Sequence, residues 1–130
     1  MDLGDLADRL DDAADRVGPE IQRTVRRQAD RLRDAIRQNA SGRPGPNVIT
    51  GAYRASWRIE EFPVPNGGGA EIGTDKPQGR RLEFGFVGTD SLGRFYNQPP
   101  FAHVEPAVNE LSPQIEAAFR SALNDIFGGA

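Results

Sequence analysis

Apolar residues in the first forty positions recur at the spacing of a helix. From Leu3 to Ile36 they are separated by three or four residues, and charged side chains fill most positions between them. This period places one narrow apolar stripe along a helix. Gly18 and Pro19 interrupt the stripe, and a proline inside a helix removes a backbone hydrogen bond. The pattern therefore predicts a helical region at residues 1–41, with either a kink at Gly18-Pro19 or a second helix that begins at Pro19.

The middle of the chain changes to the pattern of strands and turns. Turn-forming residues fill positions 41–47, and residues 55–62 then mix aromatic and β-branched side chains, which is typical of a strand. Residues 63–69 predict a hairpin connection with a flexible, glycine-rich tip. A short partner strand is expected at residues 70–73.

Towards the C-terminus a helical period returns. Residues 81–87 predict either a strand or a short helical turn, and residues 88–100 predict a long loop of the kind that is usually functional or mobile. From Pro106 the apolar residues again step by three or four up to Ile126, and two glycines follow as a stop signal. Pro113 lies within this pattern after a serine suited to capping a helix, so we expect the helix to bend or restart there.

Together these elements predict an α+β fold with a long N-terminal helix, a small antiparallel sheet and a C-terminal helix. A chain of 130 residues suits one domain of ordinary size. We therefore expect a single domain, with a helical region at 1–41, sheet and loops at 44–105, and the C-terminal helix at 106–127.

Charge is distributed unevenly along the N-terminal helix. Residues 1–20 carry seven acids and two arginines, residues 21–43 carry seven arginines and two acids, and the net charge of the chain is -3. The asymmetry suits the helix dipole. Three interpretations stay open: a solvated helix face, a head-to-tail contact between subunits, or DNA binding by the arginines. The hydrophobic fraction of 37% is low for an independent monomer, which indicates that neighbouring subunits supply some of the burial.

The sequence offers little material for catalysis. It has no cysteine and one histidine, His103, which excludes disulfides and zinc sites built on thiolates or paired imidazoles. We expect this histidine to be structural or solvent-facing. The acids of the predicted strands are expected to be solvated or paired with arginines. These acids are Glu60, Glu61 and Glu83, with Arg58 and Arg81 as partners.

Cofactor and membrane signals are equally weak. The glycines at 67–69 lack the lysine and hydroxyl residue that follow in a phosphate-binding loop. No stretch approaches the roughly 20 apolar residues that span a bilayer, and the acidic start lacks the pattern of a signal peptide. We therefore expect a soluble protein made in the cytoplasm, with no enzymatic activity, no catalytic or metal-binding residues, and no cofactor.

Three local motifs, in this order, resemble one family of phage proteins. Pro46–Ser56 is similar to a segment with the pattern Thr-Gly-x-Leu-Arg-x-Ser, and Leu82–Gly85 to a Val-Glu-Phe-Gly-Thr segment. Pro99–Ala107 is similar to a Pro-Pro-Phe segment that leads through Pro-Ala into the final helix. The family is the small neck or tail-completion protein of lambda-like long-tailed phages, the gene-product-ten-like minor tail component. Tyr53 stands where this family has leucine, and Phe86 where it has threonine.

The resemblance implies an α+β fold and a structural role in the virion. It implies rings of this chain, with six copies expected, stacked at the junction between the portal complex and the tail tube. DNA would pass through the lumen without sequence-specific binding. The partners would be other copies of the chain, the head-tail stopper, the tail terminator and the tail tube, and not a membrane. Assembly into the virion would follow synthesis in the host cytoplasm.

Other functions compete with this interpretation. A tail terminator that caps the tail tube is the alternative within the same class, and nothing in the sequence separates the two. A DNA-binding module that uses the arginine-rich helix is the alternative from a second class. A small hydrolase would need a shaped pocket with perturbed groups, and the sequence lacks residues to build one.

Two groups of residues are candidates for these roles, one at a subunit interface and one in the motifs that shape the fold. Charges on the helix and aromatic residues in the loop at 88–100 are candidates for the contact between two different surfaces that a ring requires. The candidate subunit-interface residues are Asp8, Asp12, Asp15, Arg23, Arg26, Arg27, Arg31, Arg94, Phe95 and Tyr96. The candidate fold-motif residues are Thr50, Gly51, Trp57, Glu83, Phe84, Gly85, Pro100, Phe101 and Pro106. The expected large core residues are Trp57, Phe62, Phe84, Phe101 and Phe119.

Overall fold

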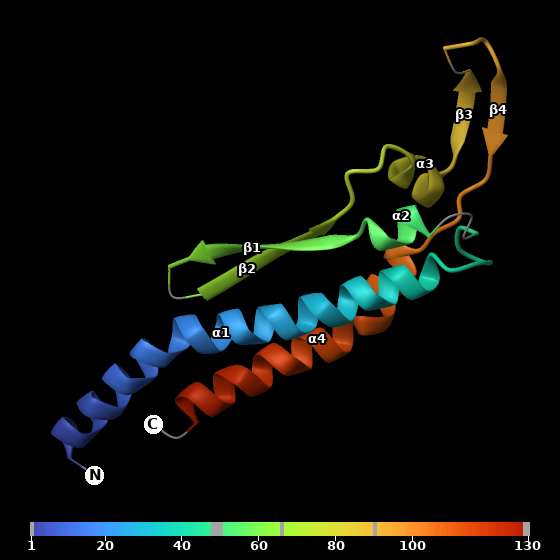
Figure 1. The fold of residues 1–130 in the computed structure, drawn as a ribbon. Helices are drawn as coiled ribbons and strands as arrows, with labels where there is room; N and C mark the ends of the chain where they lie inside the picture. The colour runs from blue at the N-terminus through green and yellow to red at the C-terminus, as the bar shows by residue number, and fades with distance from the viewer. Residues whose placement is uncertain (1, 48–50, 66, 90, 129–130) are drawn as a thin grey trace. The chain divides into compact units, whose positions relative to one another are not determined.

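A computed structural model of the chain describes residues 2–47, 51–65, 67–89 and 91–128. The fold is α+β, as predicted, with a long N-terminal helix and a C-terminal helix (Figure 1). The strands form two separate two-stranded sheets, β1 with β2 and β3 with β4. In chain order the elements are α1 (Leu3–Asn39), α2 (Ala52–Ala55), β1 (Arg58–Val64), β2 (Gly67–Gly73), α3 (Gln78–Phe84), β3 (Phe86–Thr89), β4 (Phe95–Gln98) and α4 (Val104–Phe127).

The chain forms two compact units, each built from segments that are distant in the sequence. The first unit contains residues 1–31, 59–71 and 111–130, and the second contains residues 32–58 and 72–110.

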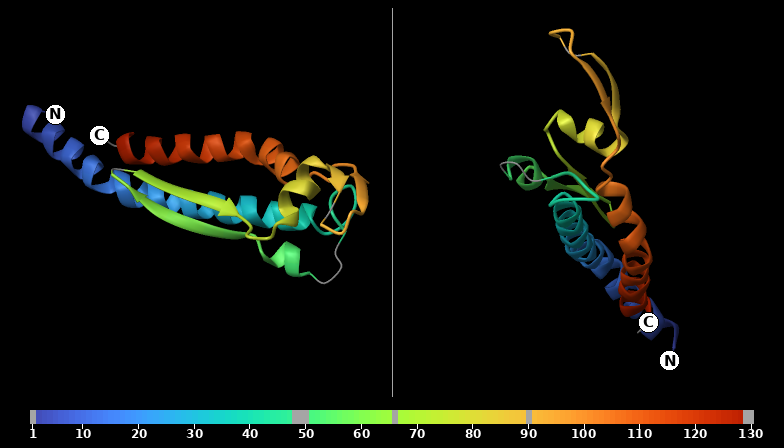
Figure 2. Two further views of the ribbon diagram at one scale, coloured as in Figure 1. Left: turned by 90° about the horizontal axis from the view of Figure 1, so that it is seen from above. Right: turned by 90° about the vertical axis from the view of Figure 1, so that its right-hand side faces the viewer.

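In the first unit, α1 and α4 lie side by side (Figures 1 and 2). Small residues of α1 are buried, with Ala13 at 2% and Ala29 at 7% exposure, and Ile126 of α4 is buried as well. Thr24 is also buried, and its hydroxyl donates a hydrogen bond to the carbonyl of Glu20 at 3.0 Å, so this polar group is satisfied inside the helix. Small buried side chains let helices approach closely but supply only a modest apolar core.

Both long helices continue through their internal prolines. Pro19 lies inside α1, whose axis bends in its N-terminal third (Figure 1), so the alternative of two consecutive helices is wrong. Pro113 lies inside α4, so the predicted restart there is also wrong. Helix α4 begins at Val104, before the predicted start at Pro106. Pro106 falls in its first turn, where a backbone N–H has no partner within the helix and its loss costs little.

The predicted pairing of two consecutive strands is confirmed, with β1 and β2 as the strands, but the predicted bounds of their connection are wrong. Residues 63–64 belong to β1, and the glycines at 67–69 belong to β2. A Cβ on Gly68 would lie 2.8 Å from Cα of Gln22, and a Cβ on Gly69 would overlap the ring of Phe62. These glycines allow the backbone of β2 to approach α1 and the neighbouring strand. The predicted strand at 55–62 is displaced as well, because α2 occupies positions up to Ala55.

The predicted long loop at 88–100 contains most of a β-hairpin. Strands β3 and β4 are antiparallel and pair Phe86 with Gln98 and Thr89 with Phe95. Gly93, in the connection, has φ of +78°, a conformation that glycine adopts at little cost. Residues 88–89 and 95–98 of the segment therefore have the regular backbone of paired strands.

The core of the second unit consists of Ile36, Trp57 and Ala107. Partly buried apolar residues pack against it, namely Leu32, Ala35, Tyr53, Ile72 and Val104.

Of the expected large core residues, Trp57 is buried at 7% exposure, and Phe101 and Phe119 are half-buried. The prediction is wrong for Phe62, at 44% exposure, and for Phe84, at 72%. Neighbouring residues of a helix point to different sides. Glu83 takes the buried side of the short helix α3, which leaves Phe84 outside.

We expect Gly68→Ala to destabilise the protein by about 1–3 kcal/mol, because the added methyl group meets the backbone of α1. Gly73→Ala in the same strand is the matched control, since nothing lies within 4 Å of a Cβ there. Urea unfolding monitored by circular dichroism measures both. Equal stabilities of the two variants would contradict the close approach of β2 to α1.

Candidate functional site

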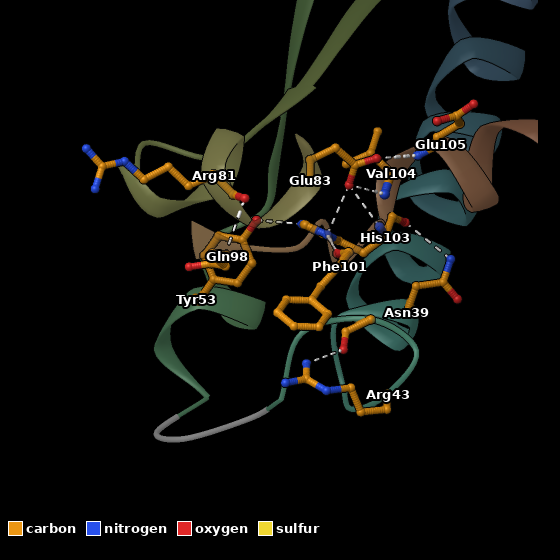
Figure 3. A network of polar contacts seen from close by, with 11 residues as sticks. Asn39, Arg43, Tyr53, Arg81, Glu83, Gln98, Phe101, His103, Val104 and Glu105 are labelled. Carbon is orange, nitrogen blue, oxygen red and sulfur yellow. Dashed lines mark hydrogen bonds and ion pairs between the residues drawn. The ribbon is translucent and has the colours of Figure 1, made fainter. Parts of the chain in front are cut away.

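A buried carboxylate binds the start of α4 in the second unit. Glu83 is 8% exposed, and its side chain accepts hydrogen bonds from three consecutive backbone N–H groups (Figure 3). The donors are His103 at 2.8 Å, Val104 at 3.0 Å and Glu105 at 2.9 Å. The first N–H groups of a helix have no partners within it, and the helix dipole favours a negative charge at this end. Glu83 therefore caps α4, and the prediction of a solvated or arginine-paired carboxylate is wrong.

Opposing effects act on the ionisation of Glu83. Burial acts to raise its pKa, whereas the three N–H donors and the nearby ring of His103 act to lower it. The donors prevail, and the pKa of Glu83 lies below its ordinary value of 4.5. The carboxylate is therefore ionised at neutral pH although it is buried.

His103 continues the network from the other side. The side chain is fully buried, with Nδ1 at 3.0 Å from a Glu83 oxygen and 2.9 Å from the carbonyl oxygen of Phe101. Both oxygens are acceptors, so Nδ1 carries a proton. Nε2 lies 2.6 Å from the hydroxyl of Tyr53. Asn39 donates a hydrogen bond to the carbonyl of His103 at 3.2 Å. The histidine is structural, one of the two outcomes expected from the sequence.

Aromatic packing encloses this polar network. The rings of Tyr53, Trp57 and His103 meet edge to face, with centroids 5.6 to 6.2 Å apart. Burial raises the pKa of Tyr53 to about 12, so its hydroxyl stays protonated. Arg37 donates a hydrogen bond to the carbonyl of Trp57 at 2.6 Å. Tyr53 takes the position where the resembled family has leucine, and its hydroxyl reaches the buried histidine. We call Glu83, His103 and Tyr53 the buried anchor.

The buried anchor is suited to holding the fold together and not to catalysis. Its histidine is inaccessible to a substrate, and its carboxylate is occupied by backbone donors. Over the part of the chain that the structure describes, no group of three or more histidines, cysteines or acids is placed to hold a metal ion. Within the same residues, no helix combines the length and apolar character needed to cross a membrane.

The residues after Glu83 shape the connection to the β3–β4 hairpin. Gly85 has φ of +81°, and a Cβ there would lie 2.8 Å from the carbonyl oxygen of Gln98, so only glycine fits. The backbone N–H of Phe101 donates to the carbonyl of Leu82 at 2.6 Å. The fold-motif residues Glu83, Gly85 and Phe101 thus have structural roles. Gly51 has φ of +80° at the start of α2, whereas Thr50 lies outside the described residues.

The hairpin has one face that packs internally. Phe86 and Tyr96 share this face, with ring centroids 6.4 Å apart, and the guanidinium of Arg81 lies 3.9 Å from the centre of the Phe86 ring. The opposite face carries Val87 and Phe95, each 69% exposed.

Further apolar side chains are exposed at neighbouring positions of the sequence. Leu92, in the connection between β3 and β4, is 75% exposed, and Phe84 precedes the hairpin at 72% exposure. Tyr96 is 38% exposed, and Arg94 is also exposed. We call Phe84, Val87, Leu92 and Phe95 the hairpin patch. Sequence reasoning found Phe95 but missed the other three, because Phe84 suggested a core residue and the hairpin suggested a loop.

The acidic side chains and the arginines of α1 lie in different surroundings. Asp8, Asp12 and Asp15 are exposed. The arginines of the other half instead engage partners within their own unit. Arg23 pairs with Glu20 at 2.9 Å, Arg26 pairs with Glu61 at 3.0 Å, and Arg31 donates a hydrogen bond to Gln114. Arg27 is exposed and lines a hollow that also contains Asp30 and Asp125.

The charged side chains Glu61 and Arg58 of β1 have other partners than those predicted. The hydrogen bond from Arg26 is the main cause that lowers the pKa of Glu61, and Gln22 adds a second hydrogen bond at 2.8 Å. Arg58 pairs with Asp75 at 2.8 Å, and not with an acid of its own strand. The long-range partners of these side chains could not be identified from local sequence.

Glu83→Gln should destabilise the protein by about 2 kcal/mol, because the amide cannot accept from all three N–H groups and turns a donor towards some of them. Glu60→Gln, at an exposed position of β1, is the matched control and should be neutral. Chemical denaturation at neutral pH measures both variants. A Glu83→Gln variant as stable as the control would show that the cap contributes nothing.

The same cap predicts a dependence on pH. Because the pKa of Glu83 is lower in the folded protein than its ordinary value of 4.5, ionised Glu83 stabilises the fold fully above that value, and the stabilisation is lost as the pH falls through the folded pKa. The difference in free energy of unfolding between the wild type and Glu83→Gln should therefore shrink as the pH falls from neutrality to below 4.5. Denaturation curves across this range test it, and a difference that stays constant would contradict the assignment.

No curated protein and no solved structure matches the chain. The model of one protein family matches residues 4–95, more than half of the chain, and that family is described as "Bacteriophage HK97-gp10, putative tail-component". The matched range includes Glu83 and most of the hairpin, and it ends before α4. Two of the three sequence motifs, Pro46–Ser56 and Leu82–Gly85, lie in the matched range, whereas Pro99–Ala107 lies beyond it. The match confirms the resemblance, and the chain belongs to the HK97-gp10-like family of bacteriophage tail components.

Proposed function

We propose that this chain forms a homo-oligomeric ring at the head-to-tail junction of the virion, where it completes the neck and lets DNA pass through its lumen. Family membership supports a structural role in the phage tail. The ring, its position and the passage of DNA are what the proposal adds. In this role the protein works through its surfaces and performs no turnover.

The observation that carries the proposal is the amount of apolar side chain left at the surface. Among the described residues, thirteen large apolar or aromatic side chains are exposed, whereas eight hydrophobic residues are buried and four of those are alanines. Isolated exposed apolar residues are common in proteins, but a group of them marks a contact surface. The hairpin patch is such a group. We propose that it docks against neighbouring proteins of the neck, such as the head-tail stopper, the tail terminator or the tail tube.

The arginines of α1 fit a structural subunit better than a DNA-binding module. Binding to the phosphate backbone requires cations that are free to exchange their counterions. Arg23 and Arg26 instead pair with acids of the same unit, and Arg31 is engaged by a glutamine. We therefore propose that DNA passes the ring without sequence-specific contacts.

The hairpin patch should be required for joining heads to tails. Val87→Ser with Phe95→Ser removes two exposed apolar side chains, so the fold should keep its thermal stability while the number of joined virions falls at least about tenfold. Leu123→Ser, at a residue of α4 that is 44% exposed, is the matched control. Electron microscopy of lysates from a phage that carries each variant counts heads, tails and joined particles. Normal joining by the double variant would rule out this surface.

Cryo-electron microscopy of the intact virion tests the position. A ring of this chain between the portal complex and the terminal ring of the tail supports the proposal. A ring seated directly on the tail tube would identify the tail terminator instead. A virion without this chain would contradict both assignments.

A further inference from the structure

The first turns of α1 expose an apolar edge. Leu3, Leu6 and Leu10 lie three and four residues apart, and they are 84%, 37% and 48% exposed. The first buried residue of the helix is Ala13. The backbone N–H of Asp5 donates to the side chain of Asp2 at 2.8 Å, so the helix has a cap at its start.

Acids flank the leucines of this segment. Asp2, Asp5, Asp8, Asp11 and Asp12 are all exposed. Residues 2–12, which we call the leucine segment, thus form an amphipathic helix end with an open apolar edge. Its other positions carry five acids and one arginine, Arg9, together with Gly4 and Ala7. Such a helix end is suited to a groove with an apolar floor and a basic rim.

The second unit contains a hollow with that character. Its volume is about 840 Å³, within the range of pockets that take a bound group. The hollow is lined by apolar and aromatic residues together with three cations and three amides. The apolar and aromatic lining comprises Ala40, Pro46, Gly51, Ala52, Tyr53, Pro77, Leu82 and Phe101. The cations are Arg43, Arg54 and Lys76, and the amides are Asn47, Gln78 and Gln98.

Among the described residues, the contacts of the arginines of the hollow are with neutral groups. The guanidinium of Arg43 lies 3.7 Å from the centre of the Phe101 ring and donates to the carbonyl of Gly45 at 3.0 Å. Arg54 donates to the hydroxyl of Ser41 at 3.2 Å. These partners are neutral, and none of the described residues that line the hollow carries a carboxylate. The described lining of the hollow therefore combines three cations with apolar side chains and contains no carboxylate.

We propose that this hollow receives the leucine segment of a second copy of the chain. The leucines would cover the apolar floor, and the aspartates would face Arg43, Arg54 and Lys76. Charge complementarity selects this occupant, because the segment is the most acidic stretch of the chain and the hollow carries three cations. The contact joins two different surfaces, which is the type of interface that builds a ring. The inference rests on the proposed ring and names the contact that closes it.

Two variants separate the halves of this contact. Leu6→Ser with Leu10→Ser disables the segment, and Arg54→Glu with Lys76→Glu disables the hollow. All four residues are exposed, so the fold should be unchanged, as circular dichroism can verify. Leu123→Ser and Arg80→Glu, at exposed positions outside the segment and the hollow, are the matched controls.

Sedimentation of the full-length chain over a concentration series gives the first result. The wild type and the controls should self-associate, and each disabled variant alone should do so at least about tenfold more weakly. An equal mixture of the two disabled variants has one intact contact per pair, so it should form a heterodimer and stop there. Added salt should weaken the wild-type association, because exposed charges are screened.

Other results would overturn the inference. A mixture that forms no heterodimer while the wild type associates would exclude this pairing of surfaces. A wild type that stays monomeric at every concentration would exclude a second copy as the occupant.

Cross-linking identifies the occupant directly. A photo-reactive residue at position 6, in a mixture of isotopically light and heavy chains, should link to residues that line the hollow of a different copy, such as Arg43 and Arg54. Links confined to one copy, or to another virion protein, would also overturn the inference. Head-to-tail joining through the hairpin patch is measured separately, so this contact can fail while the proposed function stands.

Discussion

The second unit depends on the hydrogen bonds between the carboxylate of Glu83 and the first three N–H groups at the start of α4. A buried charge without partners is costly, and so are buried N–H groups without acceptors. The hydrogen bonds between the carboxylate and the N–H groups offset both costs. The acceptor comes from a residue twenty positions before the first donor. The contact fixes α3 against the start of α4, and the chain between them has to leave and return within a short span. Gly85, with its positive φ, makes that turn and starts the hairpin.

The two long helices were the part of the fold that the sequence determined best. Helix α1 has 37 residues and α4 has 24, so each repeats the apolar period often enough for it to stand out from local irregularities. The strands are only four to seven residues long, and two of them carry glycines that suggest turns. Gly68 and Gly69 are required by the approach of another backbone segment and a ring. Local sequence does not show which segments approach these glycines, so the glycines predict a connection although they lie in a strand.

At the site, too, local sequence does not predict the contacts of single residues with distant parts of the chain. Polarity suggested a surface position for Glu83 and a core position for Phe84, and the structure has the reverse. The N–H groups that bind Glu83 lie at the start of α4, whereas Glu83 lies in α3. No local sequence pattern predicts that the start of α4 takes its acceptor from α3. Tyr53 is a related case, because its hydroxyl is explained only by the buried ring of His103 fifty residues later. The single-domain organisation, the subunit interface and the ring stay predictions, since the contacts that define them involve more than one element or more than one chain.

The reversal at Glu83 and Phe84 has a consequence for assembly. In a helix of seven residues, adjacent side chains point to different sides, so the position that holds the fold and the position that faces outward are set by the same backbone. The buried cap holds α3 in place, and Phe84 is thereby presented next to the hairpin at a fixed position. A contact surface made of pre-placed side chains loses less conformational entropy on binding than a mobile loop does. A short motif can therefore serve stability through Glu83 and, in the proposed function, assembly through Phe84, and of the two only a substitution of Phe84 should affect assembly without affecting stability.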